Sequence, residues 1–167
     1  MRCLARLWLS PPCKQFLPGY ARTMYKLFVA IHLIGASIWV GGHLVLCATV
    51  LPRALRKRDP SIIQDFESGF EHIGLPALLL QVVSGLWLAY HRLPSVSVWL
   101  SLDSTLSWLI AGKLFLLFAT VCLALNAQLR VIPRLTADNL HILGWHIFRV
   151  TVFAIGFLLI GVGIRTL

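Results

Sequence analysis

The sequence predicts an all-α integral membrane protein: a four-helix antiparallel bundle with an amphipathic surface helix between its first and second spans. The chain has 167 residues, of which 58% are hydrophobic and only 13% are charged, and a soluble domain of this length cannot bury that much apolar surface. The apolar residues gather in four segments, each close to the roughly 20 residues that cross a hydrocarbon core. These predicted spans are residues 25–51, 73–90, 106–127 and 142–164.

The connections between the spans carry their own signals. The first span ends at Pro52 and leads into a basic cluster, after which residues 60–72 place apolar residues at helical spacing among acidic ones. This pattern predicts an amphipathic helix on the membrane surface. The second span ends before Pro94, and the loop that follows contains Trp99, a candidate anchor at the membrane interface.

Residues 1–23 differ from the rest of the chain. They contain four basic residues, no acidic residue and three prolines. This composition is typical of a short targeting leader, or of a misassigned start that precedes a natural start at Met24. We expect this segment to be disordered and without a chemical role, and the membrane domain to comprise residues 24–167.

The net charge of +9 comes from basic residues that flank the spans and form no surface stripe with interleaved aromatics, so nucleic-acid binding is not expected. The lipid bilayer is the expected partner. The loops after spans one and three hold six basic residues: Arg53, Arg56, Lys57, Arg58, Arg130 and Arg134. The opposite side holds three if the chain starts at Met24, which places those loops in the cytoplasm and both termini outside, in a bacterial inner membrane. If the leader is retained, the opposite side holds seven basic residues, and the count of basic residues does not determine the orientation.

The histidines inside the apolar spans are the main functional signal, because ionisable groups at membrane depth are costly and mark sites. His32 and His43 are eleven residues apart, about three helical turns, so they share one face at a separation of roughly 16 Å. With alternating spans, the ionisable residues fall into two layers. The outer layer holds His32, His91 and Lys113, and the cytoplasmic layer holds His43, His72, His146 and Arg149, with His141 at the boundary.

Two layers of histidine in a four-helix bundle are suited to one or two b-type haems, with imidazoles as axial ligands and cations near the propionates. The candidate cofactor-binding residues are His32, Lys113, His91 and Arg149, and the candidate metal ligands are His32, His43, His72 and His146. Other interpretations stay open, because boundary histidines are common at interfaces and Lys113 can extend to the membrane surface.

Other chemistries have little support. The four cysteines show no paired spacing, and Cys47 and Cys122 are expected to be small buried residues. The chain has only two methionines, so a copper route through thioether ligands is not indicated. No nucleophile with a base and no phosphate-binding loop is visible.

The segment HLIGASIWVGGHLVL, the following LPRAL, and FEHIGLPALLLQVVSGLWLAY resemble the small four-helix members of the CopD family, named for bacterial copper resistance and uptake. The resemblance continues through RVIPRLTADNL and the last span, so it covers residues 24–167. It implies a membrane protein that handles copper through histidines, with a copper-delivery protein as a partner.

A more distant resemblance is to the HemJ-type protoporphyrinogen oxidases, which are associated with haem b. Their first span has a histidine followed by tryptophan and glycine, matched by His32, Trp39 and Gly41, and their third has a lysine matched by Lys113. The resemblance implies importance for His32 and Lys113. The histidines His43, His72 and His146 depart from that pattern and indicate a second metal centre.

The leading expectation is therefore a CopD-type protein that handles copper. The alternative is a haem-b redox protein, either an electron carrier with an electron-transfer partner or an oxidoreductase related to HemJ or to b561-type proteins. A third is an assembly or scaffolding subunit whose histidines only bond between helices. The expected cofactor is copper or haem b, and an enzymatic role is expected only with haem.

Overall fold

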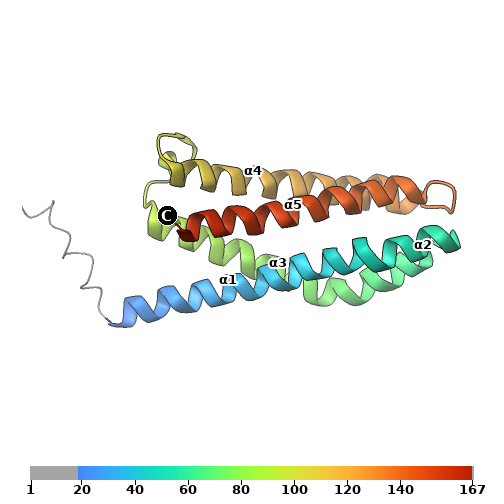
Figure 1. Cartoon of the computed structure of the whole chain (residues 1–167), viewed down its shortest axis with the longest axis horizontal. Coiled ribbons are helices and arrows are strands. Elements are labelled where there is room, and N and C mark those ends of the chain that lie inside the picture. The colour runs from blue at the N-terminus through green and yellow to red at the C-terminus, as the bar shows by residue number, and fades with distance from the viewer. Residues whose placement is uncertain (1–18, 167) are drawn as a thin grey trace, which may run out of the picture.

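The computed structural model describes residues 19–166 and shows a bundle of long helices (Figure 1). Within this range four helical rods are long and apolar enough to cross a membrane, and no strand is present, which confirms the predicted all-α bundle. Most of the predicted leader, residues 1–18, lies outside the described residues. Residues 19–23 form the first turn of helix α1, so the described helix begins before Met24.

The first rod is built from three helical pieces: α1 (Gly19–Val45), the π-helix η2 (Leu46–Val50) and α2 (Leu51–Lys57). Pro52 lies in the first turn of α2, directly after the π-helix, and lacks the backbone N–H that a residue inside a continuous rod donates to the preceding turn. The rod ends at Arg58, whose backbone is left-handed with φ of 52°. The backbone N–H of Asp59 then donates to the carbonyl of Ala54 at 3.1 Å and closes the turn.

The second rod is a single helix, α3 (Ser61–Arg92), so the predicted surface helix at residues 60–72 is wrong as a separate element. Those residues form the first turns of α3, because α2 extends the first rod far enough to cover their apolar face. Ile63 has no exposed surface and packs in a core cluster with Leu51 and Leu140. Because other helices of the protein already bury this hydrophobic face, it does not have to be buried at the membrane surface.

Asp59 stabilises the start of α3. Its Oδ1 accepts hydrogen bonds from the Ser61 hydroxyl at 2.7 Å and from the Ser61 backbone N–H at 3.0 Å. These bonds hold the pKa of the Asp59 carboxyl below its usual range, with the hydroxyl bond as the larger cause.

The third rod comprises α4 (Thr105–Asn126), the π-helix η4 (Ala127–Val131) and the short 3₁₀ helix η5 (Ile132–Arg134), and the fourth is α5 (Leu140–Thr166). Ser104 and Ser107 form a capping box at the start of α4.

The loop before α4 contains the 3₁₀ helix η3 (Val96–Leu100). Trp99 in this helix is only 7% exposed, and its indole N–H donates to the Leu93 carbonyl at 2.9 Å. The expectation of an interfacial anchor at Trp99 is therefore wrong, because the loop folds over the ring and satisfies its N–H.

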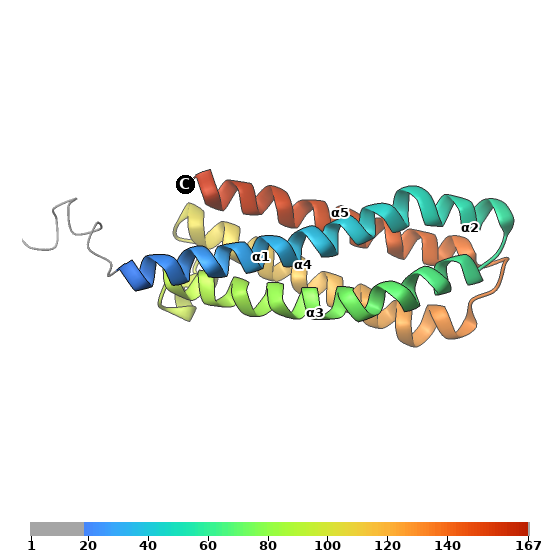
Figure 2. The same ribbon diagram turned by 90° about the horizontal axis from the view of Figure 1, so that it is seen from below.

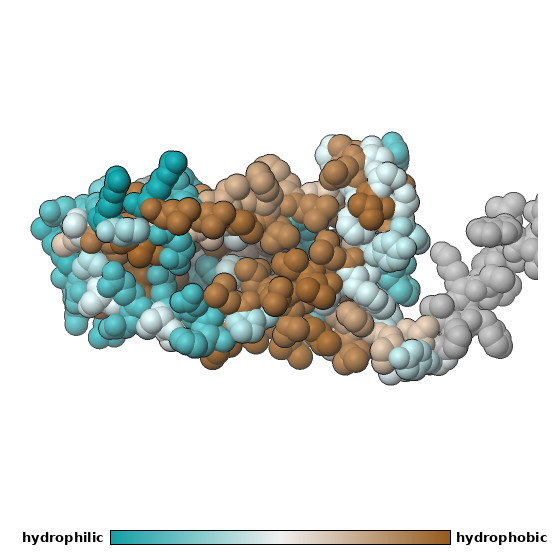
Figure 3. All heavy atoms as spheres, turned by 180° about the vertical axis from the view of Figure 1, so that it is seen from behind, coloured by the Kyte–Doolittle hydropathy of each residue, from teal (hydrophilic) through white to brown (hydrophobic). Residues whose placement is uncertain are grey.

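The rods associate as two hairpins, α1 with α3 and α4 with α5 (Figures 1 and 2). The first hairpin is very close at Gly35, where an added Cβ would lie 2.8 Å from the Ala77 carbonyl. The hairpins meet through α1 and α5, whereas α3 and α4 make no comparable contact. On the face drawn in Figure 3, hydrophobic residues cover the middle of the molecule and hydrophilic residues gather towards the end that holds the α2–α3 turn, as expected for a bilayer-spanning protein.

Candidate functional site: two cavities of opposite charge

Two cavities lie between the described helices, one in each half of the length of the bundle. The Lys113 cavity, of about 440 Å³, lies towards the α3–α4 loop and is lined by all four rods. The Glu67 cavity, of about 340 Å³, lies towards the α2–α3 turn and is also lined by all four rods. Both volumes fall in the range typical of cofactor and ligand sites.

The Lys113 cavity combines apolar walls with a positive charge. Its charged lining residues are Arg92 from α3, Lys113 from α4 and Arg165 from α5, and no acidic residue of the described part of the chain lines it. Arg92 is held at this end of the bundle because its Nη1 donates to the Ile164 carbonyl at 2.9 Å and its Nε donates to the Tyr25 hydroxyl at 3.3 Å. An amphipathic ligand with anionic groups is complementary to such a cavity.

His32 lies on α1 in the wall of this cavity and is held by α3. Its Nδ1 lies 2.9 Å from the Gln81 backbone carbonyl and 3.1 Å from the Ser84 Oγ. A carbonyl can only accept, so Nδ1 carries the proton and donates. Ser84 directs its own hydroxyl proton to the Leu80 carbonyl at 2.5 Å, which leaves its oxygen free to accept from His32. The Nε2 of neutral His32 therefore keeps its lone pair, and it has no hydrogen-bond partner among residues 19–166.

Two glycines make room for the functional side chains. A Cβ on Gly85 of α3 would lie 2.9 Å from Cε1 of His32, and a Cβ on Gly161 of α5 would lie 3.4 Å from Nζ of Lys113. Each side chain thus lies against the backbone of the neighbouring helix in its own hairpin. These glycines serve close packing of a side chain, which is a common use of small residues between membrane helices.

Gln81 is a further polar residue in the lining of the Lys113 cavity. The residue is 8% exposed, and its side-chain Oε1 is a buried acceptor without a hydrogen-bond partner in the described part of the chain. Unpaired buried polar groups are rare and costly in native proteins. The atom belongs to a cavity-lining residue beside His32, which fits a cavity that receives a ligand or ordered water.

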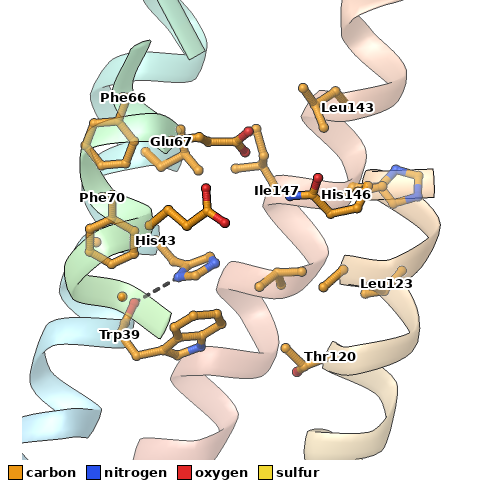
Figure 4. A pocket seen from close by; sticks show the side chains of 18 of the residues that line it. Trp39, His43, Phe66, Glu67, Phe70, Thr120, Leu123, Leu143, His146 and Ile147 are labelled. Atoms are coloured by element: carbon orange, nitrogen blue, oxygen red, sulfur yellow. Dashed lines mark hydrogen bonds between the residues drawn. The ribbon is translucent and has the colours of Figure 1, made fainter. Parts of the chain in front are cut away.

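The Glu67 cavity has the opposite character. Its acidic lining residues are Glu67 and Glu71 of α3, and among residues 19–166 no lysine or arginine lines it. Figure 4 shows Glu67 and His43 reaching into the space between the helices. The Nδ1 of His43 donates to the Trp39 carbonyl in its own helix at 2.9 Å, and its Nε2 has no partner among the residues that the structure describes.

His146 also lines the Glu67 cavity, but it does not face His43. Figure 4 shows the two imidazoles well apart, with His146 directed towards α4. Its Nδ1 donates to the Ile142 carbonyl at 2.9 Å, and its Nε2 lies 3.0 Å from Oδ1 of Asn126. Both ring nitrogens of His146 therefore have a hydrogen-bond partner. If the side-chain amide of Asn126 is turned by 180°, its NH₂ group donates to Nε2 in place of its oxygen accepting from it. His43 and His146 therefore line the same cavity, but their imidazoles are not placed to bind one metal ion together.

The other predicted site residues lie outside both cavities. His91 is exposed and packs beside Tyr25 and Trp87, with ring centroids 5.1 and 5.2 Å away. His72, His141 and Arg149 are exposed on the helix surfaces. Across residues 19–166, no three or more His, Cys, Asp or Glu side chains come close enough together to hold a metal ion. Of the predicted residues, His32 and Lys113 thus line one cavity, and His43 and His146 line the other.

Trp39 and Thr120 line both cavities and so lie between them, one on α1 and the other on α4. The Trp39 ring also packs on His43, with centroids 4.4 Å apart.

Sequence reasoning does not identify Gln81, the two acidic residues or the two arginines of these cavities as site residues; the last four are Glu67, Glu71, Arg92 and Arg165. A signal for Gln81 is present in the sequence, since it is an uncharged polar residue in the middle of an apolar span. The two arginines enter the sequence argument only through the topology count, and Glu67 enters it only as part of the predicted surface helix.

No protein-family model, curated protein or solved structure matches this chain. The resemblances to CopD and HemJ proteins stay predictions, and the function is to be inferred from the residues of the two cavities.

Proposed function

We propose that this protein is a haem-b-binding membrane redox protein that holds the haem in the Lys113 cavity. The observation that carries the proposal is His32: an imidazole with its Nδ1 proton donated to another helix and its Nε2 lone pair free, in the wall of an apolar, cationic cavity. Haem iron in membrane bundles takes axial imidazoles of this kind.

The residues of the cavity fit the rest of the group. Haem is a flat apolar ring with two carboxylates, and the lining combines extensive apolar surface with three cations and no acid. Arg92 and Arg165 would neutralise the propionates, Lys113 would add a third positive charge to the lining, and the apolar side chains of the four helices would exclude water. Bound haem supplies one-electron exchange. The chain's own residues bind it, orient it through His32 and limit solvent access.

Haem fits these residues better than copper does. The copper function expected from the CopD resemblance requires several ligands at one point, and the Lys113 cavity offers a single imidazole beside cations, which repel a metal ion. An electron-transfer protein is the partner that a haem carrier of this kind requires.

The test is the absorption spectrum and metal content of the full chain, purified in mild detergent from cells supplied with haem precursor and copper. We expect the α and Soret bands of haem b in the reduced-minus-oxidised spectrum, and iron in excess of copper. His32→Ala should lose most of the bound haem, because it removes the imidazole that would hold the haem.

His91→Ala is the matched control, since His91 lies at the same end of the bundle but is exposed and does not line the cavity. It should keep the wild-type spectrum. Stoichiometric copper without iron, or an unchanged haem content in His32→Ala, would overturn the proposal.

A further inference from the structure

Residues 19–166 form two hairpins that share several features at a constant spacing in the sequence. The π-helix at 46–50 is followed by Pro52 and Arg53, and 81 residues further on the π-helix at 127–131 is followed by Pro133 and Arg134. Both π-helices therefore stand at the same distance before the same Pro-Arg pair. π-helical turns are rare, so this coincidence of position strongly supports equivalence.

Functional side chains are separated by the same 81 positions in the sequence. Lys113 stands 81 residues after His32, and both line the Lys113 cavity. Thr120 likewise stands 81 residues after Trp39, and these are the two residues shared by both cavities on α1 and α4. Each hairpin also provides a glycine on its second helix, against which the His32 ring and the Lys113 amine lie.

The helices α1 and α4 run in the same direction, since one hairpin follows the other across the membrane (Figures 1 and 2). A repeat of this kind places its axis along the membrane normal, and membrane proteins built from such repeats bind ligands at the interface between them. The equivalence is incomplete, because α1 packs on α5 whereas α3 and α4 stand apart.

We infer that the two hairpins form one ligand site between them, and that Lys113 contacts the ligand from the side opposite His32. The ligand class is a flat molecule with two accessible faces and anionic substituents. Its identity as haem rests on the proposed function, whereas the opposed placement of the two side chains rests on the repeat and on the shared cavity.

The first experiment replaces Lys113 by a second imidazole. Lys113→His should convert the spectrum of the bound haem from one-imidazole to two-imidazole ligation, and His32→Lys combined with Lys113→His should recover at least half of the haem lost in His32→Lys alone. Phe118→His is the control, because Phe118 lies on the same helix but is 69% exposed on the lipid side. A Lys113→His spectrum identical to that of Phe118→His would overturn the inference.

The second experiment requires no haem, so it separates this inference from the proposed function. In haem-free protein, cysteines at positions 32 and 113 should be joined by a short bifunctional thiol reagent, with the native cysteines replaced by alanine. The pair at 32 and 118 is the control and should not be joined. Efficient joining with no haem in any sample would refute the proposed function and support the opposed placement, whereas equal joining of both pairs would overturn the placement.

Discussion

At the residue scale, the hydrogen bonds of the histidines distinguish a site from ordinary helix chemistry. His43, His72 and His146 each use Nδ1 to bond a carbonyl four residues earlier in their own helix, an arrangement available to a histidine in any helix. His32 instead bonds α3, so its ring orientation depends on the packing of two helices. Partners of this type fix the tautomer and raise the basicity of a metal-ligating imidazole.

Ser84 tests that role. Ser84→Ala leaves the Gln81 carbonyl as the remaining acceptor for the His32 Nδ1 proton. We expect the affinity for haem to fall by about tenfold, the low end for loss of such a partner, and the midpoint potential to rise because a less basic imidazole stabilises ferric iron less. Haem titration into haem-free protein and potentiometric titration measure the two effects.

The control is Ser37→Ala, the same change at an exposed serine whose hydroxyl bonds only to Leu33 in its own helix. It should leave both quantities unchanged. If Ser84→Ala behaves like Ser37→Ala, Ser84 has no part in positioning His32.

At the element scale, two glycines of α3 in the first hairpin have different surroundings. Gly85 accommodates the His32 ring, whereas a Cβ added at Gly69 of the same helix would have no atom within 4 Å. Both lie in the interior of α3, where alanine is preferred over glycine by about 1 kcal/mol. The two positions therefore separate the effect of helix propensity from the effect of packing.

We predict that Gly85→Ala displaces the His32 ring and lowers haem occupancy severalfold, because the new methyl group would lie 2.9 Å from Cε1. Gly69→Ala should keep full occupancy and raise the stability of the protein in detergent. Thermal unfolding and the haem-to-protein absorbance ratio measure both variants. Equal occupancy in the two variants would show that Gly85 does not hold the ring in place.

At the scale of the whole molecule, the orientation of the chain in the membrane can be tested. One membrane-crossing helix, α3, lies between the turn at Arg58 and the loop at Ser97. Reporter proteins fused after these two residues should therefore lie in opposite compartments, and a chain that starts at Met24 should place the Arg58 reporter in the cytoplasm. Reporters that lie on the same side would exclude a membrane-spanning α3.

The charge of the two cavity linings also differs along the length of the bundle. The Lys113 cavity has three cations in its lining and the Glu67 cavity has two carboxylates, with Trp39 and Thr120 between them. A ligand with anionic groups is therefore directed to one half of the bundle. This division depends on all four rods, since each cavity takes residues from every one of them.

The sequence alone determined the fold class and two residues of the candidate site. The length of an apolar segment is a local property, and a bilayer turns it directly into a spanning helix, so the four rods followed without knowledge of their contacts. His32 and Lys113 followed from the cost of placing ionisable groups at membrane depth. Only the tertiary structure decided that residues 60–72 continue into α3, that His146 faces Asn126, and that Gln81 and Ser84 lie beside His32. These outcomes depend on how each helix is rotated about its axis and on which distant residues it meets, because packing between segments far apart in the chain sets both.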